Sequence, residues 1–473
     1  MSKEPNRNVY VGHRYVPKIM GEWDNQIDYE GLSIVTHQGA SYTSKKRVPV
    51  GIDILNEEFW VVTGNYDAQV EYYREETLKI SKALKDKTDL KSESVTYKIP
   101  TDFIDLQQAI DTLSLFHMSN KTTITLLIER GHELNTNLVL ENGDYSHYRI
   151  SSVDDIVYVS EDHPGGTLFD IINSRSPVFN VLVNCQSMVN MGIKASRTST
   201  VTVEENKGIT HAYTTNLYVT EGSTAYARNC NFTYGSQGTK DGGSGGSGIL
   251  AWGGRIYAEG TDVSNSKSYG AQAAHGGTLS FRNGKANNIG RYGVRATNGA
   301  YIDCRSMESI GAEVYNIYAF GASIINARQC NIGQSERGVV SVGGSNIDAR
   351  NTMINDVVIG VQAGSSSVVN FYEGSVKGAT ENGIQISSLG TVSAVYAKVL
   401  NSGSSSLRVD FGFLDFTGGT VSGLGELDLY IIKGATVKMA QAKTRSSTES
   451  EPMLDDLNIT AFNEHTNFGV VYN

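Results

Sequence analysis

A row of arginines beside a row of carboxylates and amides carries most of the chemistry that this sequence offers. The arginines recur at a nearly constant interval, and they are Arg282, Arg305, Arg328 and Arg350. A second row stands just before them in each repeat and consists of Ser280, Asp303, Asn326, Asp348 and Asn370. Guanidinium groups bind phosphate and carboxylate oxyanions bidentately. The arginines and Asn326 are therefore our candidates for binding an anionic ligand.

Asp303 and Asp348 are our candidates for catalysis. They lie two repeats apart, with Asn326 between them. If each repeat is one coil of stacked strands, their carboxylates are separated by roughly 9–10 Å. That distance is at the upper edge of the range of about 6.5–9.5 Å used by inverting glycosidases, in which one acid protonates the leaving oxygen and the other activates water.

A salt-bridge ladder explains the same two rows without any ligand. Opposite charges on one face of a sheet relieve the repulsion between stacked arginines and add little stability. We rank this ladder ahead of anion binding, and anion binding ahead of catalysis. Glu259 and Asp262 form a second acidic pair, which we assign to a solvated corner.

Aromatic side chains at outward positions are a further candidate site. Trp252 and Tyr318 fall at these positions in their repeats, as does Phe320. Such rings stack on sugars, but a contact between copies of the chain would bury the same residues. Both interpretations stay open, and we name Trp252 and Tyr318 as ligand-binding candidates.

The elements that must position these residues follow from a repeat. Its glycine positions, one of them occupied by asparagine, are Gly248, Gly270, Gly293, Asn316, Gly338, Gly360 and Gly383. A fixed period of roughly 22–23 residues indicates a solenoid, in which each repeat buries its apolar face against its neighbours. The unit is too short for two helices, so strands fit it better.

Two strands are visible in each repeat. The first has inward residues at period two, such as Val294 and Ala296, and the second continues with Ile302 and Cys304. Gly-rich corners separate the strands. We predict an all-β, right-handed parallel β-helix, because parallel crossovers strongly prefer that hand.

Composition excludes several classes of protein. The net charge of −10 argues against a nucleic-acid partner. No run approaches the ~18 apolar residues of a membrane span, and no secretory signal is visible. The four cysteines form no CxxC pair, so we expect free buried thiols. The sequence contains no recognisable metal-ligand spacing, phosphate-binding loop or Ser-His-Asp order, and we predict no cofactor.

The N-terminal third differs from the repeats. Trp23, Tyr29, Tyr42 and Trp60 lie in short alternating runs, which predicts a small β-rich module with an aromatic core or a sugar platform. Residues 68–87 have a 3-4-3-4-3 apolar spacing, typical of a short coiled coil. Residues 101–116 predict a helix capped by Thr101 or Asp102, which covers the open end of the β-helix.

These observations divide the chain into five parts. We predict a small N-terminal module, a helical neck, a capping helix, the β-helix, and a linker with a C-terminal tip, at residues 1–67, 68–95, 96–121, 122–440 and 441–473. The resemblances that follow imply that the first of these is a virion-anchoring or carbohydrate-binding-like module.

Two stretches resemble known families. The run that includes Asn8–Gly12, Gly21–Asp24 and Thr63–Tyr66 resembles the N-terminal module of phage appendage and tailspike proteins, above all the pre-neck (collar) appendages of small short-tailed phages of Gram-positive bacteria. The segment Phe103–Asp111 is similar to the helix before the first coil of the pectate-lyase-like superfamily. The aromatic spacing of residues 21–60 also resembles small chitin-binding-type modules.

The phage resemblance implies a homotrimer in the virion, made in the host cytoplasm and released by lysis. Its N-terminal module binds other collar or tail proteins, and its β-helix adsorbs to a host cell-wall glycan such as wall teichoic acid. The alternative is a depolymerase that cleaves teichoic acid or capsule. A secreted bacterial pectate-lyase-like enzyme is a third class, which the lack of a visible signal disfavours. The self-cleaving C-terminal chaperone of the family is large, and we expect no counterpart in the short segment 441–473 that follows the predicted β-helix.

Overall fold

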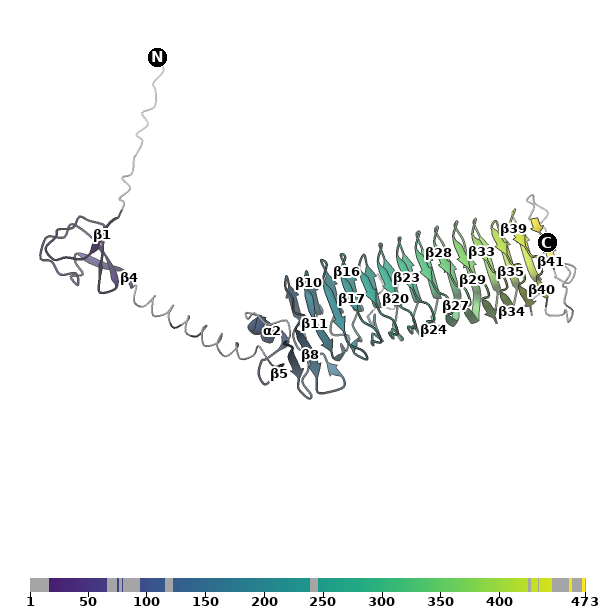
Figure 1. The fold of residues 1–473 in the computed structure, drawn as a ribbon, viewed down its shortest axis with the longest axis horizontal. Helices are drawn as coiled ribbons and strands as arrows, with labels where there is room; N and C mark the ends of the chain where they lie inside the picture. The colour runs from purple at the N-terminus through teal and green to yellow at the C-terminus, as the bar shows by residue number, and fades with distance from the viewer. Residues whose placement is uncertain are drawn as a thin grey trace, which may run out of the picture. The chain divides into compact units, whose positions relative to one another are not determined.

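The structure is a computed structural model of the whole chain (Figure 1). It describes residues 17–65, 75, 79, 94–114, 122–238, 246–423, 427–432, 434–444, 459–461 and 470–472. The chain forms two compact units, which meet in the sequence between Lys91 and Ser92. In the described part of the chain, no helix is long and apolar enough to cross a membrane.

The first unit contains a four-stranded sheet of β1 (Lys18–Glu22), β2 (Ser33–His37), β3 (Ala40–Ser44) and β4 (Trp60–Asn65). β1 pairs in parallel with β2, and the other neighbours are antiparallel. Tyr29 and Trp60 are each 2% exposed and pack edge to face with ring centroids 5.3 Å apart. Trp23 and Tyr42 are partly buried against the same cluster. Tyr29 and Trp60 therefore build the core of this unit, whereas Trp23 and Tyr42 keep part of their side chains exposed.

The predicted neck at 68–95 lies almost wholly outside the described residues. Only Glu75 and Lys79 of the heptad segment are described, and both are helical. The coiled coil stays a prediction.

The second unit is a parallel β-solenoid, and its strands follow one another along a single stack (Figure 1). One face is a 16-stranded parallel sheet, whose strands are β5 (Val95–Ile99), β6 (Ile124–Ile128), β8 (Tyr148–Ser152), β11 (Arg175–Asn180), β14 (Thr200–Val203), β17 (Thr224–Tyr226), β19 (Arg255–Tyr257), β21 (Thr278–Ser280), β23 (Tyr301–Asp303), β26 (Ile324–Asn326), β28 (Asn346–Asp348), β30 (Val368–Asn370), β33 (Thr391–Ser393), β36 (Phe413–Asp415), β39 (Thr436–Lys438) and β42 (Val470–Tyr472). We call this face the short-strand sheet.

A second face carries the strands that contain the repeat glycines, and we call it the glycine-side sheet. Its strands are β7 (Leu138–Glu141), β10 (Thr167–Ile172), β13 (Met191–Ser196), β16 (Thr215–Thr220), β18 (Ser247–Trp252), β20 (Tyr269–Ala274), β22 (Tyr292–Thr297), β25 (Tyr315–Phe320), β27 (Asn331–Ser341), β29 (Met353–Ala363), β32 (Asn382–Ser387), β35 (Ser405–Asp410), β38 (Leu427–Ile432) and β41 (Ile459–Ala461). All of their pairings are parallel.

A third face was not visible in the sequence. Its strands are short, and they are β9 (Val157–Tyr158), β12 (Leu182–Asn184), β15 (Gly208–Thr210), β24 (Glu308–Ile310), β31 (Ser375–Lys377), β34 (Lys398–Ser402), β37 (Thr420–Gly423) and β40 (Lys443–Thr444). Single bridges through Asn231, Asp262 and Lys285 carry the pairing from β15 to β24. β27 and β29 bend at Gln334 and Asp356, both with positive φ, and so run across this face and the glycine-side sheet.

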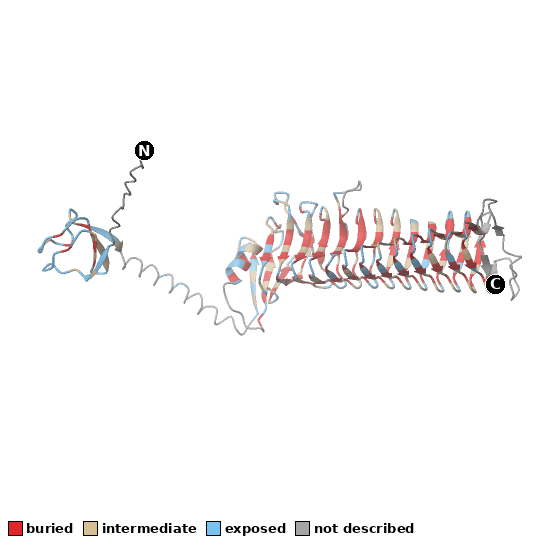
Figure 2. Cartoon of the chain, turned by 90° about the horizontal axis from the view of Figure 1, so that it is seen from above, coloured by how far each residue is buried: buried red, intermediate tan, exposed pale blue. Residues whose placement is uncertain are grey.

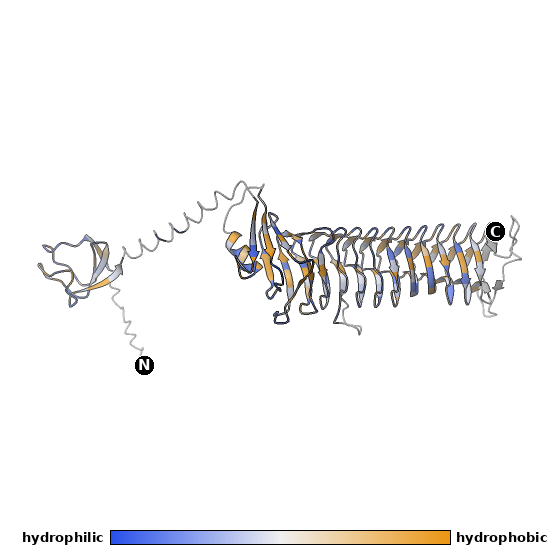
Figure 3. Ribbon diagram, turned by 90° about the horizontal axis from the view of Figure 1, so that it is seen from below, coloured by the Kyte–Doolittle hydropathy of each residue, from blue (hydrophilic) through white to orange (hydrophobic). Residues whose placement is uncertain are grey.

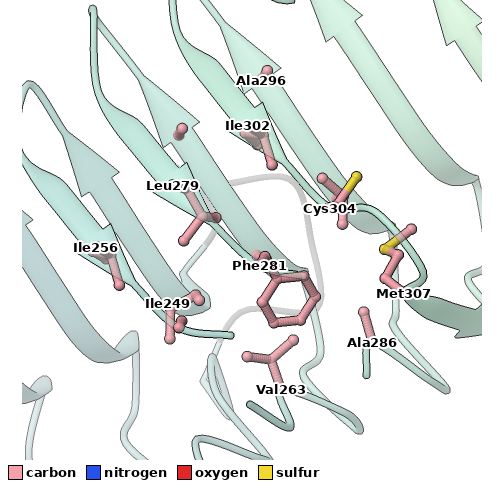
Figure 4. Close-up of a cluster of buried hydrophobic side chains, with 14 of the residues drawn as sticks. Ile249, Ile256, Val263, Leu279, Phe281, Ala286, Ala296, Ile302, Cys304 and Met307 are labelled. Atoms are coloured by element: carbon pink, nitrogen blue, oxygen red, sulfur yellow. The ribbon is translucent and has the colours of Figure 1, made fainter. Parts of the chain in front are cut away.

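The core consists of stacked columns of apolar residues. Ile256, Leu279 and Ile302 pair in register on successive strands, and Figure 4 shows them pointing into one cluster. Val294 and Ala296 face inward from the glycine-side sheet, as the period-two pattern predicts. Buried residues recur along the solenoid (Figure 2), and apolar and polar residues both occur along its strands (Figure 3). The predicted parallel solenoid is confirmed, whereas its handedness stays a prediction.

The helix next to the first strand begins later than predicted. α2 spans Leu106–Ser114, and its N-cap is Asp105, whose carboxylate accepts the backbone N–H of Gln108 at 2.8 Å. The predicted cap Asp102 instead accepts the backbone N–H of Lys98 at 2.7 Å. The apolar stripe of α2 joins the solenoid core through Leu106, Ala109, Ile110 and Leu113.

The two ends of the solenoid extend past the predicted boundaries. β5 precedes α2 and pairs with β6, so the first strand comes before the capping helix. At the other end, β41 pairs with β38 and β42 pairs with β39. The described strands of the predicted C-terminal tip thus continue the two larger sheets.

Candidate functional site

The predicted arginine and aspartate rows are aligned in the structure. Strand register pairs Ser280 with Asp303, Asp303 with Asn326, Asn326 with Asp348, and Asp348 with Asn370. Further along each coil, backbone hydrogen bonds connect neighbouring coils at Arg282, Arg305, Arg328 and Arg350, whose carbonyls accept N–H groups of the preceding coil. The solenoid pitch therefore turns the interval of one repeat into vertical alignment, with strands about 4.8 Å apart.

We call these four arginines with Asp303 and Asp348 the Arg–Asp stripe. Asp303 binds two guanidinium groups: Arg305 donates from Nε and Nη2 at 2.9 Å each, and Nε of Arg282 lies 3.0 Å from Oδ2. Asp348 repeats this arrangement. Nε and Nη2 of Arg328 lie 2.7 Å and 2.6 Å from Oδ2 of Asp348, and Arg350 donates to the same carboxylate from Nε and Nη2 at 2.9 Å each.

Both carboxylates are thus paired with guanidinium groups. Burial acts to raise the pKa of Asp348, but hydrogen bonds from Arg350 and Arg328 outweigh it and leave that pKa below its usual value. A general acid needs a raised pKa so that it still carries a proton near neutral pH. The geometry therefore favours the ladder interpretation, and the catalytic role of Asp303 and Asp348 stays a prediction.

Asn326 lies between the two paired carboxylates. Its Oδ1 is buried and accepts no hydrogen bond within the described structure. Because Asn326 is neutral, the four arginines and two aspartates of the stripe give it a formal charge of +2. Each guanidinium places its Nε against a carboxylate and has further N–H groups. The four arginine side chains are between 36% and 48% exposed.

The same column extends toward the N-terminus. The backbone N–H of Asn229 donates to the carbonyl of Glu259, which places Arg228 in register with Glu259. Arg228 Nε donates to Glu259 at 2.9 Å, and the hydroxyl of Ser280 donates to the same carboxylate at 2.7 Å. Glu259 is therefore part of the column, and it lies beside an arginine instead of standing free in solvent.

Trp252 and Tyr318 lie on the glycine-side sheet, away from the stripe. Trp252 is 41% exposed, and its ring centroid is 4.0 Å from that of His275. Tyr318 is half-buried and packs on Tyr292 and Tyr315. The sequence-predicted site residues therefore occupy two separate faces.

Tyr318 belongs to a cluster that our sequence reasoning missed. We call this cluster the Tyr–Arg patch, and its members are Tyr269, Tyr292, Tyr315, Tyr318, Arg291, Arg295 and Arg337. Three of the tyrosines precede the repeat positions Gly270, Gly293 and Asn316 directly, so their recurrence once per repeat was available as a signal. The arginines show no such regular spacing.

Two hollows lie elsewhere on the solenoid. One, of about 350 Å³, is lined by Val203, Glu204, Glu205, Tyr226 and Arg228. The other, of about 450 Å³, lies beside the bends of β27 and β29 and has the carboxylates of Glu313, Glu336 and Asp356 on its wall. Among the described residues, no group of three His, Cys, Asp or Glu side chains is placed to hold a metal ion.

All four cysteines are buried, unpaired thiols. Burial raises the pKa of Cys230 to about 12, with a smaller contribution from Glu205. This thiol is therefore protonated and poorly nucleophilic at neutral pH.

No family model matches this chain, and no curated protein sequence matches it.

Proposed function

We propose that this chain is a phage virion appendage whose solenoid adsorbs to a glycan on the host surface. One observation carries the proposal: guanidinium side chains repeat in register along the outside of the solenoid, one per coil from Arg282 to Arg350. A row of equal contacts at a fixed rise suits a ligand that is itself a repeating polymer. Guanidinium groups suit a polymer with phosphate or carboxylate groups, such as wall teichoic acid.

The identity as a virion protein rests on the resemblance of the N-terminal segment. We assign virion attachment to the first unit, which has its own core around Trp60. The protein is then made in the host cytoplasm, assembled with collar or tail proteins, and released by lysis.

We further propose that three copies associate. Exposed apolar residues recur at the first position of the strands of the short-strand sheet, where Tyr301, Ile324, Val368 and Phe413 are between 39% and 50% exposed, with the polar Asn346 and Thr391 between them in the same column. A surface that mixes exposed apolar residues with polar ones suits a contact between copies of the chain. Light scattering of the purified chain should give three times its mass of 51.3 kDa. A double variant, Ile324→Asn with Phe413→Asn, should lower that mass.

A sedimentation assay tests adsorption. The full chain is mixed with purified cell walls from a panel of Gram-positive bacteria, intact or stripped of teichoic acid, and the bound fraction is measured after centrifugation. We expect binding to at least one intact wall and its loss from the stripped wall. A chain that stays in the supernatant with every wall would contradict the proposal.

The same samples separate a binder from a depolymerase. We expect no soluble polymer fragments, because Asp303 and Asp348 are each held by two guanidinium groups. If fragments do appear, Asp303→Asn and Asp348→Asn must abolish them for that pair to be catalytic.

A further inference from the structure

The Tyr–Arg patch is a stack of rings interleaved with guanidinium groups on the glycine-side sheet. Ring centroids of Tyr292 and Tyr315 lie 4.9 Å apart with planes 15° from parallel, and those of Tyr315 and Tyr318 lie 5.1 Å apart at 17°. Arg295 lies 4.8 Å from the centroid of Tyr269. Arg291 and Arg337 are 5.4 Å and 5.5 Å from the rings of Tyr292 and Tyr315, respectively. These are cation–π distances.

The three arginines give the Tyr–Arg patch a positive charge. Among the residues that the structure describes, none of Arg291, Arg295 and Arg337 forms an ion pair. Arg337 donates to the neutral amide of Gln362 at 2.6 Å. The Nε of Arg295 is buried and has no hydrogen-bond partner in the described structure. The Arg–Asp stripe differs in this respect, because its arginines share two aspartates.

A buried guanidinium N–H without an acceptor is costly, since guanidinium is an obligate donor. A cluster of three cations without an ion pair among the described residues also stands out on a chain whose net charge is −10. An external anion that binds these partly exposed side chains explains the unpaired charge.

We propose that the Tyr–Arg patch binds the anionic group of a carbohydrate ligand, a phosphate, sulfate or carboxylate attached to a sugar. The guanidinium groups of Arg291 and Arg295 hold the anion, and the tyrosine hydroxyls and ring edges contact the sugar. This inference rests on the proposed function, because it assigns a further contact with the anionic groups of the adsorbed glycan. That contact lies on a different face of the solenoid from the Arg–Asp stripe.

The ring geometry favours a sugar over a nucleic acid. Bases bind to single-strand-binding proteins by stacking on open aromatic faces. Here the faces of Tyr292 and Tyr315 are covered by each other and by guanidinium groups. Edges and hydroxyls remain, and these suit hydrogen bonds to a polyhydroxylated ligand.

The experiment is titration calorimetry of the full chain with three probes: dextran sulfate, neutral dextran, and a short oligothymidylate. The test variant combines Arg291→Gln with Arg295→Gln. The matched control is Arg255→Gln, which removes an exposed arginine of β19 that forms no ion pair within the described residues. Arg295→Lys provides a milder change, because it keeps the charge and loses the planar fork.

We expect the wild-type chain to bind dextran sulfate in a salt-dependent manner and not to bind neutral dextran. The double variant should bind dextran sulfate at least tenfold more weakly, Arg295→Lys should show an intermediate loss, and Arg255→Gln should change affinity less than twofold. Thermal unfolding confirms that each variant is folded, and a misfolded double variant leaves Arg295→Lys as the deciding measurement. Equal affinity of variants and wild type, or no binding by the wild type, overturns the proposal. Tighter binding of the oligothymidylate than of dextran sulfate overturns it in favour of a nucleic acid.

The wall-sedimentation assay keeps the two proposals apart. If the double variant still adsorbs to walls like the wild type, adsorption stands and the assignment to this patch fails. If the wild type binds dextran sulfate through the patch but no wall, the patch stands and the adsorption function fails.

Discussion

Replacing Asp348 with Asn tests whether the Arg–Asp stripe is a structural ladder. The carboxylate of Asp348 binds both Arg328 and Arg350, at distances between 2.6 and 2.9 Å. Asn has almost the same shape, but it carries no charge, and its amide nitrogen places a donor against guanidinium donors. The two arginines then repel each other without a shared anion between them.

The size of the effect follows from the exposure of these groups. The side chains of Arg328 and Arg350 are 40% and 36% exposed, so solvent screens both pairs. Ion pairs of this kind contribute about 0.2–1 kcal/mol each, so the loss of two pairs should lower the free energy of unfolding by about 0.5–2 kcal/mol. A buried pair would cost about 3–5 kcal/mol on removal of one partner.

The pH dependence has a definite sign. The pKa of Asp348 in the folded chain lies below its ordinary value, because hydrogen bonds from Arg350 and Arg328 outweigh the effect of burial. Its contribution to stability is therefore fully present above the unfolded pKa of about 3.9 and is lost as pH falls through the folded pKa. The difference between wild type and Asp348→Asn should be largest at pH 7 and should shrink below about pH 4.

Urea unfolding at pH 7 and at pH 3 measures this difference, because urea, unlike guanidinium chloride, does not screen ion pairs. Hydrogen exchange of amides in β28 reports the local effect, since coils of a solenoid open in part independently. Asp415→Asn is the matched control in the same column. Within the described residues its carboxylate has one cationic partner, Lys438 at 3.4 Å, and otherwise accepts hydrogen bonds from the neutral Thr417, so its charge should matter less. Equal urea midpoints of wild type and Asp348→Asn at pH 7, or a difference that persists undiminished at pH 3, would refute the ladder.

Three further predictions concern the core. Ile325→Ala should lower the free energy of unfolding by about 2–5 kcal/mol, because the side chain is fully buried, whereas Met353→Ala, at a half-exposed side chain outside the proposed contact between copies, should change it by less than about 0.5 kcal/mol; urea unfolding measures both. Gly360→Ala should cost about 1–3 kcal/mol by the same assay, since an added Cβ would lie 2.4 Å from the carbonyl oxygen of Gly383. Cys230, whose pKa is raised to about 12 mainly by burial, should not react with a thiol reagent at pH 8 until urea unfolds the chain.

The strand register was predictable because one coil has an almost constant length. A residue and its partner one repeat later share one place in successive coils, so Ile302, Ile325 and Ile347 align as the sequence indicates. The outward columns follow from the same rule, which is why the arginine row was found. Whether a strand can be recognised in the sequence depends instead on its own alternation of apolar and polar residues. Several strands of the third face are as short as β31, with one inward residue, and between β15 and β24 this face has only single bridges such as Asn231 and Lys285, so little apolar alternation marks it.

The predicted N-cap of the helix was wrong for a local reason. Thr101 and Asp102 precede the apolar stripe and are acceptable caps by type, but the carboxylate of Asp102 is used by the backbone N–H of Lys98. Asp105 stands closer to Leu106 and caps the first turn. Sequence gives the type of a capping residue but not the turn in which its side chain finds a donor.

The two arginine-bearing faces show what a repeat period cannot reveal. Arg305 and Arg295 both project from the outside of the solenoid, and sequence spacing alone favours Arg305 because it belongs to a regular row. The structure shows that Arg305 donates twice to Asp303, so an incoming anion must compete with a carboxylate that is already in place. Arg295 lies over the ring of Tyr269, which attracts the cation through its quadrupole but does not neutralise it. Regular spacing therefore locates a row of side chains, whereas the chemistry of the adjacent column decides whether that row is still free to bind.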